Sequence, residues 1–188
     1  MARNKKFGFC DMKCVCNTQS FHTWNNILYR CYYSTKNRDA SYNQCEVCDE
    51  WLLFSNFKRW FEDKCNGYIE GHDIDKDILV KGNKIYSPDT CCFLPPEINK
   101  CFIRQKRSKN NLPIGVARHS SGRYYSRVNI HGNLKHLGMF DTPNEAFNAY
   151  KIAKEQYIKE LAEKYFQEGK ITKKVYNALI KYEVGIYD

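Results

Sequence analysis

The sequence has 188 residues, enough for one large domain or two small ones. Its formal net charge is +9, and the basic excess lies in the second half: residues 1–100 carry 14 Lys and Arg against 13 Asp and Glu, whereas residues 101–188 carry 16 against 8. No apolar run could span a membrane and no signal peptide is recognisable, so we expect a soluble, cytoplasmic protein with no membrane partner.

Two amphipathic helices are predicted near the N-terminus, over residues 21–33 and 49–63. In both, large apolar side chains recur at helical spacing, which is typical of a face packed against a core. The second helix carries most of these side chains: Trp51, Leu52, Phe54, Phe57, Trp60 and Phe61. We interpret this aromatic stripe as the core of the N-terminal half.

The ten cysteines are expected to be reduced, buried or metal-bound, because nothing predicts export. Cys45 and Cys48 have the spacing of a zinc knuckle, with Cys91 and Cys92, or Cys101, as candidate partners. Adjacent cysteines make a poor second pair, since neighbouring side chains on a strand diverge. The sequence is compatible with two alternatives: a structural Zn²⁺ ion held by these cysteines, or buried free thiols.

Residues 72–102 carry an unusual arrangement of acids. Asp73, Asp75 and Asp77 alternate along a predicted strand, which places three carboxylates on one face. A turn at 81–84 and a short apolar run follow, and a proline pair then ends that run and begins a helix that carries Asn99. The predicted order is strand, turn, strand, helix.

A polar, basic linker is predicted over residues 104–111, and we expect its cations to follow DNA phosphates. These cations are Arg104, Lys106 and Arg107, together with Lys109. From Cys101 to Phe140 the chain carries eight Lys and Arg and no Asp or Glu. A solvated surface usually mixes both signs, so a stretch of one sign favours contact with a phosphate backbone.

The C-terminal part is predicted to form three strands, over 112–118, 123–130 and 134–140, and then a long helix. A hairpin turn at 131–133 joins the last two strands. Tyr125, Arg127 and Asn129 share one face of the middle strand. The helix begins with a Thr142 cap, Pro143 and a Glu145 capping box, carries Ala146, Ala149, Tyr150, Ala153, Tyr157 and Leu161 on one face, and ends at Gly169.

This part resembles the APETALA-type (ethylene-response-factor) DNA-binding domain, which also occurs in phage and mobile-element proteins. The matching residues are Gly115-Val116, Arg118, Arg123-Tyr124-Tyr125, Arg127-Val128, His136-Leu137-Gly138, Phe140-Asp141-Thr142, Glu145-Ala146 and Ala149-Tyr150. The resemblance implies that the sheet lies in the major groove of double-stranded DNA. It implies DNA contacts from Arg118, Arg123, Tyr125 and Arg127, and from Lys135.

Residues 75–99, with Trp24, Arg30-Cys31 and Trp51 upstream, resemble the phage HNH-like (ββα-metal) endonuclease proteins that often carry such a domain behind them. The resemblance implies a divalent cation, Mg²⁺ by preference, on Asp75, Asp77 and Asn99. It also calls for a general base, usually a histidine. Lys76 stands at that position, and His72 lies nearby but on the opposite strand face.

We therefore expect an α+β protein with an HNH-like ββα-metal domain at 1–103, the linker at 104–111 and an APETALA-type domain at 112–188. The expected function is sequence-directed binding of duplex DNA with metal-dependent phosphodiester cleavage, as in a phage or homing-type endonuclease. The alternative is a non-catalytic DNA-binding or counter-defence protein whose carboxylates cap turns or pair with lysines. A third class is a protein-interaction module whose basic sheet meets an acidic partner.

Overall fold

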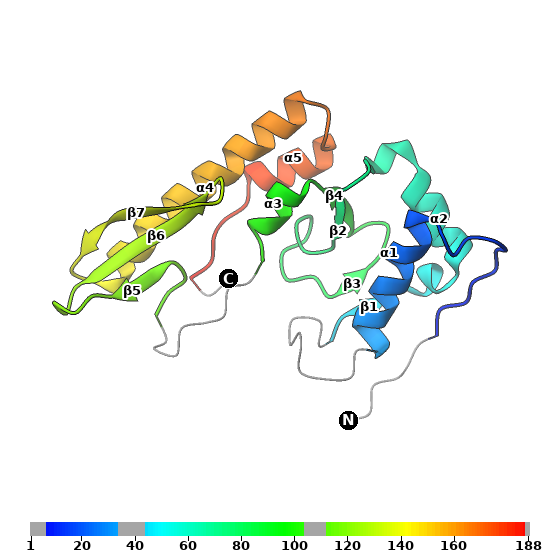
Figure 1. Cartoon of the computed structure of the whole chain (residues 1–188), viewed down its shortest axis with the longest axis horizontal. Coiled ribbons are helices and arrows are strands. Elements are labelled where there is room, and N and C mark those ends of the chain that lie inside the picture. The colour runs from blue at the N-terminus through cyan, green and yellow to red at the C-terminus, as the bar shows by residue number, and fades with distance from the viewer. Residues whose placement is uncertain (1–6, 34–43, 104–111, 187–188) are drawn as a thin grey trace. The chain divides into compact units, whose positions relative to one another are not determined.

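The computed structural model describes residues 7–33, 44–103 and 112–186, and Figure 1 labels their helices and strands. The helices are α1 (Gln19–Leu28), α2 (Phe54–Glu62), α3 (Pro96–Lys100), α4 (Pro143–Gln167) and α5 (Lys173–Ile180). The strands are β1 (Glu46–Val47), β2 (Asp73–Asp75), β3 (Ile85–Tyr86), β4 (Cys92–Leu94), β5 (Val116–Arg118), β6 (Tyr124–Ile130) and β7 (Asn133–Phe140). This mixture of separate helical and sheet elements confirms the expected α+β class.

The described residues belong to two compact units. The N-terminal unit contains the residues up to Pro96 together with Gly169–Val175, and the C-terminal unit contains the remainder. All of α3 after its first residue therefore belongs to the C-terminal unit, whereas the sequence pattern assigns it to a domain at 1–103. The predicted linker, with Arg104, Lys106 and Arg107, lies outside the described residues.

An aromatic core holds the N-terminal unit together, as the stripe in the sequence predicts. Trp51, Phe54 and Phe57 are fully buried. The rings of Trp51 and Phe57 meet edge to face with centroids 4.9 Å apart, and Trp24 Nε1 donates a 2.6 Å hydrogen bond to the backbone oxygen of Trp51. Offset and edge-on ring pairs of this kind add to the stabilisation from burial itself.

The second predicted helix is interrupted, which the hydrophobic pattern does not reveal. A 3₁₀ turn covers Asp49–Leu52, and α2 begins only at Phe54. The backbone of Phe9 lies between these segments: its N–H donates to Leu52 O at 2.7 Å, and its carbonyl accepts from Phe54 N at 3.0 Å. Because these groups bond to Phe9, one continuous helix cannot form here. The first predicted helix is confirmed as α1, extended by a π-helical turn to Tyr33.

The strands of the N-terminal unit pair between segments that are distant in sequence. β2 pairs with β4 in antiparallel register, with Asp75 opposite Cys92, and β1 pairs with β3 in parallel register. The α3 helix begins directly after β4. The predicted order of strand, strand and helix over residues 72–102 is thus present, but β2 ends at Asp75, so Asp77 lies beyond it.

The C-terminal unit contains the antiparallel sheet β5-β6-β7 and the long helix α4, which lies along the sheet in Figure 1. Val116, Val128, Ala146 and Tyr150 are buried in the core that the two layers share. His131 and Gly132 form a two-residue hairpin loop with positive φ angles of 50° and 80°, and this loop fixes the register of β6 on β7. The three-stranded sheet packed on a long helix is therefore confirmed. Two details differ from expectation: β5 covers only Val116–Arg118 of the strand expected over 112–118, and the hairpin loop has two residues where a turn over 131–133 was expected.

The start of α4 is confirmed in detail. Thr142 Oγ1 accepts from Glu145 N at 3.2 Å, and the Glu145 carboxylate accepts from Thr142 N at 3.2 Å, so the capping box closes in both directions. Gly169, with φ of 67°, follows the end of the helix. In the part of the chain that the structure describes, no helix has both the length and the apolar character that a membrane span requires.

Candidate nucleic-acid interface

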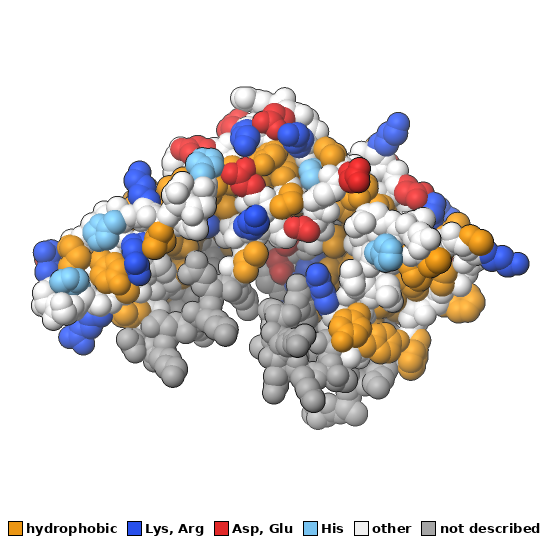
Figure 2. Space-filling model, in the orientation of Figure 1, with side chains coloured by type: hydrophobic (Ala, Val, Ile, Leu, Met, Phe, Trp, Pro, Cys, Tyr) orange, Lys and Arg blue, Asp and Glu red, His pale blue; other side chains and the backbone are white. Residues whose placement is uncertain are grey.

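One side of the β5-β6-β7 sheet turns away from α4, and we call it the open face. Alternation along β6 and the register with its neighbours assign its residues, because side chains of opposed residues share a face. Arg127 lies opposite His136, Asn129 opposite Leu134 and Tyr125 opposite Ala117. Figure 2 shows Lys, Arg and His side chains gathered over the β5–β7 part of this unit.

Tyr125 lies at the centre of a stack of aromatic and cationic groups on the open face. The guanidinium of Arg127 lies over its ring, 4.9 Å from the centroid, and Nη2 donates to the Tyr125 hydroxyl at 3.4 Å. The ring of His136 stacks on Tyr125 at 6.1 Å, and the ring of His119 meets it edge-on at 6.5 Å. A cation stacked on a ring keeps most of its donors free, so Arg127 is oriented yet available to a ligand.

Arg123 also belongs to the open face, but it is held at the end of the sheet. Its Nε donates to the Asp141 carboxylate at 2.7 Å, and Nη2 donates to the backbone oxygen of Met139 at 3.4 Å. The pair is exposed, so it contributes little to folding stability. Its effect is to fix the direction of the guanidinium and to offset part of its charge.

Arg118 and Lys135 are not brought to the open face. Arg118 lies opposite Tyr124 and Lys135 opposite Val128, and these partners pack on the helix side of the sheet. Both side chains are exposed, Arg118 at the end of β5 and Lys135 on the edge strand β7. The three-residue turn expected from the sequence would set Lys135 opposite Asn129 on the open face, and the observed two-residue loop moves it opposite Val128, on the helix side.

Sequence reasoning missed the two histidines of the open face. The observed two-residue loop sets His136 opposite Arg127, whereas the three-residue turn expected from the sequence would set it opposite Val128, on the helix side. His119 comes to the face because its N–H donates to Arg123 O at 2.8 Å, which continues the β5–β6 pairing past the end of β5. That bond depends on the loop after β5 and has no signal in the sequence.

The expected metal ligands have other partners in the N-terminal unit. The Asp75 carboxylate accepts from the backbone N–H groups of Asp77 at 2.7 Å and Ile78 at 2.8 Å, and so caps a turn. Burial raises the pKa of Asp75, and these two donors oppose the rise. Asp77 pairs with Lys76 at 2.6 Å. The expectation of three carboxylates on one strand face is therefore wrong at Asp77, because the chain turns after Asp75.

Lys76, at the usual position of the general base, is a buried structural cation. Only 5% of the residue is exposed, and its ammonium donates to Asp77 and to the backbone oxygen of Asn83. Burial alone lowers the pKa of Lys76, but the hydrogen bond and charge of Asp77 outweigh it, so the pKa lies above its ordinary value. A lysine that remains charged cannot accept a proton from water.

His72 and Asn99 complete the expected site. The His72 Nδ1 atom is buried without a hydrogen-bond partner in the described part of the chain, and burial lowers the pKa of this imidazole. Asn99 lies in α3 and so belongs to the C-terminal unit, whereas Asp75 and Asp77 belong to the N-terminal unit. Among the described residues, no group of three or more His, Cys, Asp and Glu side chains could hold a metal ion.

None of the cysteines considered as zinc ligands forms a disulfide. Cys45, Cys91 and Cys92 are buried and Cys48 is partly buried. Burial raises the pKa of all four thiols.

Glu97, which sequence reasoning missed, ties α3 to the sheet and to α4 within the C-terminal unit. Its carboxylate accepts from the Tyr165 hydroxyl at 2.7 Å, meets the His131 ring at 3.1 Å and pairs with Lys164 at 3.4 Å. The Tyr165 hydrogen bond is the largest cause that lowers the pKa of Glu97 to about 2, and His131 and Lys164 add to it. His131 belongs to the β6–β7 turn, so Glu97 supports the hairpin that carries the open face.

This network predicts a loss of stability in acid. A carboxylate whose folded pKa is about 2, against an ordinary 4.5, contributes stability that is complete above pH 4.5 and is lost as the pH falls toward 2. We expect Glu97→Gln to reduce the unfolding free energy at pH 7 by about 1–2 kcal/mol, allowing for solvent screening, and to flatten its pH dependence. Urea unfolding at pH 7, 5 and 3 measures both effects. Glu160→Gln, at an exposed site on α4, is the control and should retain the wild-type pH dependence.

Comparisons of the chain with family models, with curated proteins and with solved structures gave no match.

Proposed function

We propose that this protein binds double-stranded DNA through the open face of β5-β6-β7, with the sheet directed into the major groove. The observation that carries this proposal is the stack on Tyr125, whose ring contacts both the Arg127 guanidinium and the His136 imidazole. Stacking restricts a flexible guanidinium before DNA arrives, and a fixed guanidinium can donate two parallel hydrogen bonds to the O6 and N7 atoms of guanine.

Charge supports the same function. No acidic residue occurs between Cys101 and Phe140, and the first acid after this stretch, Asp141, is paired with Arg123. A sheet that displays cations without acidic neighbours attracts phosphates. Strands of β-ribbons and sheets are known to enter DNA grooves. Phosphate contacts position such a protein, and contacts to the base edges then give it sequence preference.

The test is binding of fluorescent duplex DNA at increasing salt. We expect the logarithm of the association constant to fall linearly with the logarithm of salt concentration, with a slope that reports several released counterions. A selection from random duplexes should then enrich a common sequence. Binding to an acidic protein with no binding to DNA would support the protein-interaction class and overturn this proposal.

Metal-dependent DNA cleavage is a second candidate function. The order of β2, β4 and α3 favours it, and so does His72, because burial lowers the pKa of its imidazole and so favours the neutral form that a general base requires. The contacts of Asp75 and Asp77 favour binding without cleavage. Incubation of supercoiled plasmid with Mg²⁺ or Mn²⁺ separates the two. Nicking that EDTA and His72→Ala both abolish would establish the nuclease; an intact plasmid under conditions where DNA is bound supports the non-catalytic protein.

A further inference from the structure

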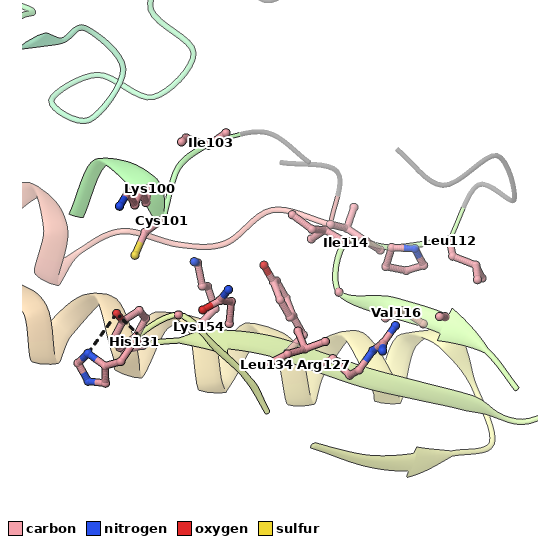
Figure 3. A pocket seen from close by; sticks show the side chains of 18 of the residues that line it. Lys100, Cys101, Ile103, Leu112, Ile114, Val116, Arg127, His131, Leu134 and Lys154 are labelled. Atoms are coloured by element: carbon pink, nitrogen blue, oxygen red, sulfur yellow. Dashed lines mark hydrogen bonds between the residues drawn. The ribbon is translucent and has the colours of Figure 1, made fainter. Parts of the chain in front are cut away.

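A cavity of about 820 Å³ lies within the C-terminal unit, at the edge of β6 that β5 leaves uncovered (Figure 3). The α3 helix and the residue after it form one wall, residues 112–117 form another, and α4 and the β6–β7 turn close the remaining sides. β5 begins at Val116, opposite Ser126, and the last backbone hydrogen bond on this side runs from Arg127 N–H to the Gly115 oxygen at 3.0 Å. The edge of β6 beyond Arg127 is therefore left uncovered by β5. Its volume is in the range of small-molecule and cofactor sites.

Cations dominate the charge of the cavity. Lys100 comes from α3, Arg127 from β6 and Lys154 from α4. The one acidic residue of the lining, Glu97, is already bonded to Tyr165, His131 and Lys164. Cys101 adds no negative charge, because burial raises the pKa of its thiol despite the nearby Lys154. The cavity is therefore complementary to an anion.

Two of these polar groups, both exposed, lack a partner among the described residues. Within the described residues, the Lys100 ammonium and the Asn129 carboxamide make no hydrogen bond or ion pair. The Lys154 ammonium forms a side-chain hydrogen bond with the Cys101 thiol. The polar groups are set among apolar side chains, including Ile103 and Leu134, which are 64% and 60% exposed. Apolar walls with a few convergent donors fit a ligand that has a flat apolar part and an anionic part.

We infer that this cavity accepts a single nucleotide, with its base on the apolar wall and its phosphate at Lys154 and Lys100. The inference rests on the proposed function, because Arg127 and Asn129 belong both to the open face and to the cavity lining. DNA lying on the open face therefore passes the mouth of the cavity. A paired base is held in the duplex by stacking, so an unpaired nucleotide enters such a pocket most easily. The Asn129 carboxamide can then both donate to and accept from the base edge.

Affinity for two DNA duplexes tests this inference. One duplex is fully matched, and the other carries a single extra unpaired nucleotide. We expect the wild type to bind the second about tenfold more tightly, the gain expected from one stacked base. Lys154→Ala should remove that preference and change the affinity for matched duplex less than twofold. Lys159→Ala, at a half-buried site on the same helix but outside the cavity, should retain it.

Alkylation of Cys101, read by peptide mass spectrometry, gives a second measurement. Its thiol lies in the cavity wall, whereas the exposed Cys65 of the N-terminal unit serves as an internal reference. The duplex with the unpaired nucleotide should slow alkylation of Cys101 at least threefold and leave Cys65 unchanged. Protection by free dAMP, but not by this duplex, would assign the cavity to free nucleotides.

The two proposals fail in different ways. Equal affinity for both duplexes, with no protection of Cys101 by the unpaired nucleotide or by dAMP, would overturn the cavity inference and leave DNA binding intact. Absence of binding to either duplex would overturn the proposed function itself.

Discussion

Arg127→Ala is expected to weaken binding of a preferred duplex by about 10- to 100-fold, which corresponds to the loss of one bidentate contact to a base. The guanidinium lies over the Tyr125 ring, faces solvent and has no acidic partner among the described residues. Its donors are therefore available to DNA without breaking an ion pair. Fluorescence anisotropy with the preferred duplex and with a scrambled duplex measures the loss.

The pattern of loss distinguishes a base contact from a phosphate contact. If Arg127 reads a base, affinity for the preferred duplex falls while affinity for the scrambled duplex stays nearly constant; if it binds a phosphate, both fall and the salt slope decreases by about one. Lys135→Ala is the matched control, because Lys135 is exposed on β7 but in register with the helix-side Val128. Its affinity should stay within about threefold of wild type, as expected for a single surface charge. Equal losses in the two variants would contradict the assignment of the open face.

Gly115→Ala is expected to destabilise the protein by about 2–4 kcal/mol, the sum of a left-handed backbone and an overpacked core. Gly115 has a φ of 75°, and a Cβ built on it would overlap the ring of Tyr150. Tyr150 is a buried residue of α4 in the core that sheet and helix share, so a shift of its ring changes the packing of that core. Urea unfolding, followed by circular dichroism, measures the loss.

Gly122→Ala separates the two causes of this effect. Gly122 has a φ of 87°, but an added Cβ would meet nothing within 4 Å. This variant should therefore lose only the contribution from backbone strain, about 1–2 kcal/mol. If both variants lose the same stability, the close approach of Gly115 to Tyr150 does not matter for folding.

Local signals in the sequence were sufficient for the start of α4 and for the order of the C-terminal strands and helix. Thr142, Pro143 and Glu145 specify the start of α4 because each satisfies or avoids an unpaired backbone group within one turn of chain. Alternation along residues 123–130 likewise places Tyr125, Arg127 and Asn129 on one face of β6, whereas the register of β6 on β7 follows from the two-residue loop that the structure shows. Such signals act over a few residues, so they can be read without knowing the rest of the fold.

Partners distant in the chain decided the remainder. The acids of residues 73–77 have the same sequence pattern whether they bind a metal or cap a turn, and the choice followed from the end of β2 at Asp75 and from the buried Lys76. Glu97 supports the β6–β7 hairpin through Tyr165 and Lys164, which lie far along the chain. The backbone of Phe9 interrupts the helix predicted over 49–63, although the sequence of that segment would allow one continuous helix. The sequence by itself determined the start of α4, the approximate positions of the C-terminal strands and which face of β6 carries Arg127. Only the tertiary structure decided which polar groups are already occupied, because hydrogen bonds and burial depend on residues that meet only in the folded chain.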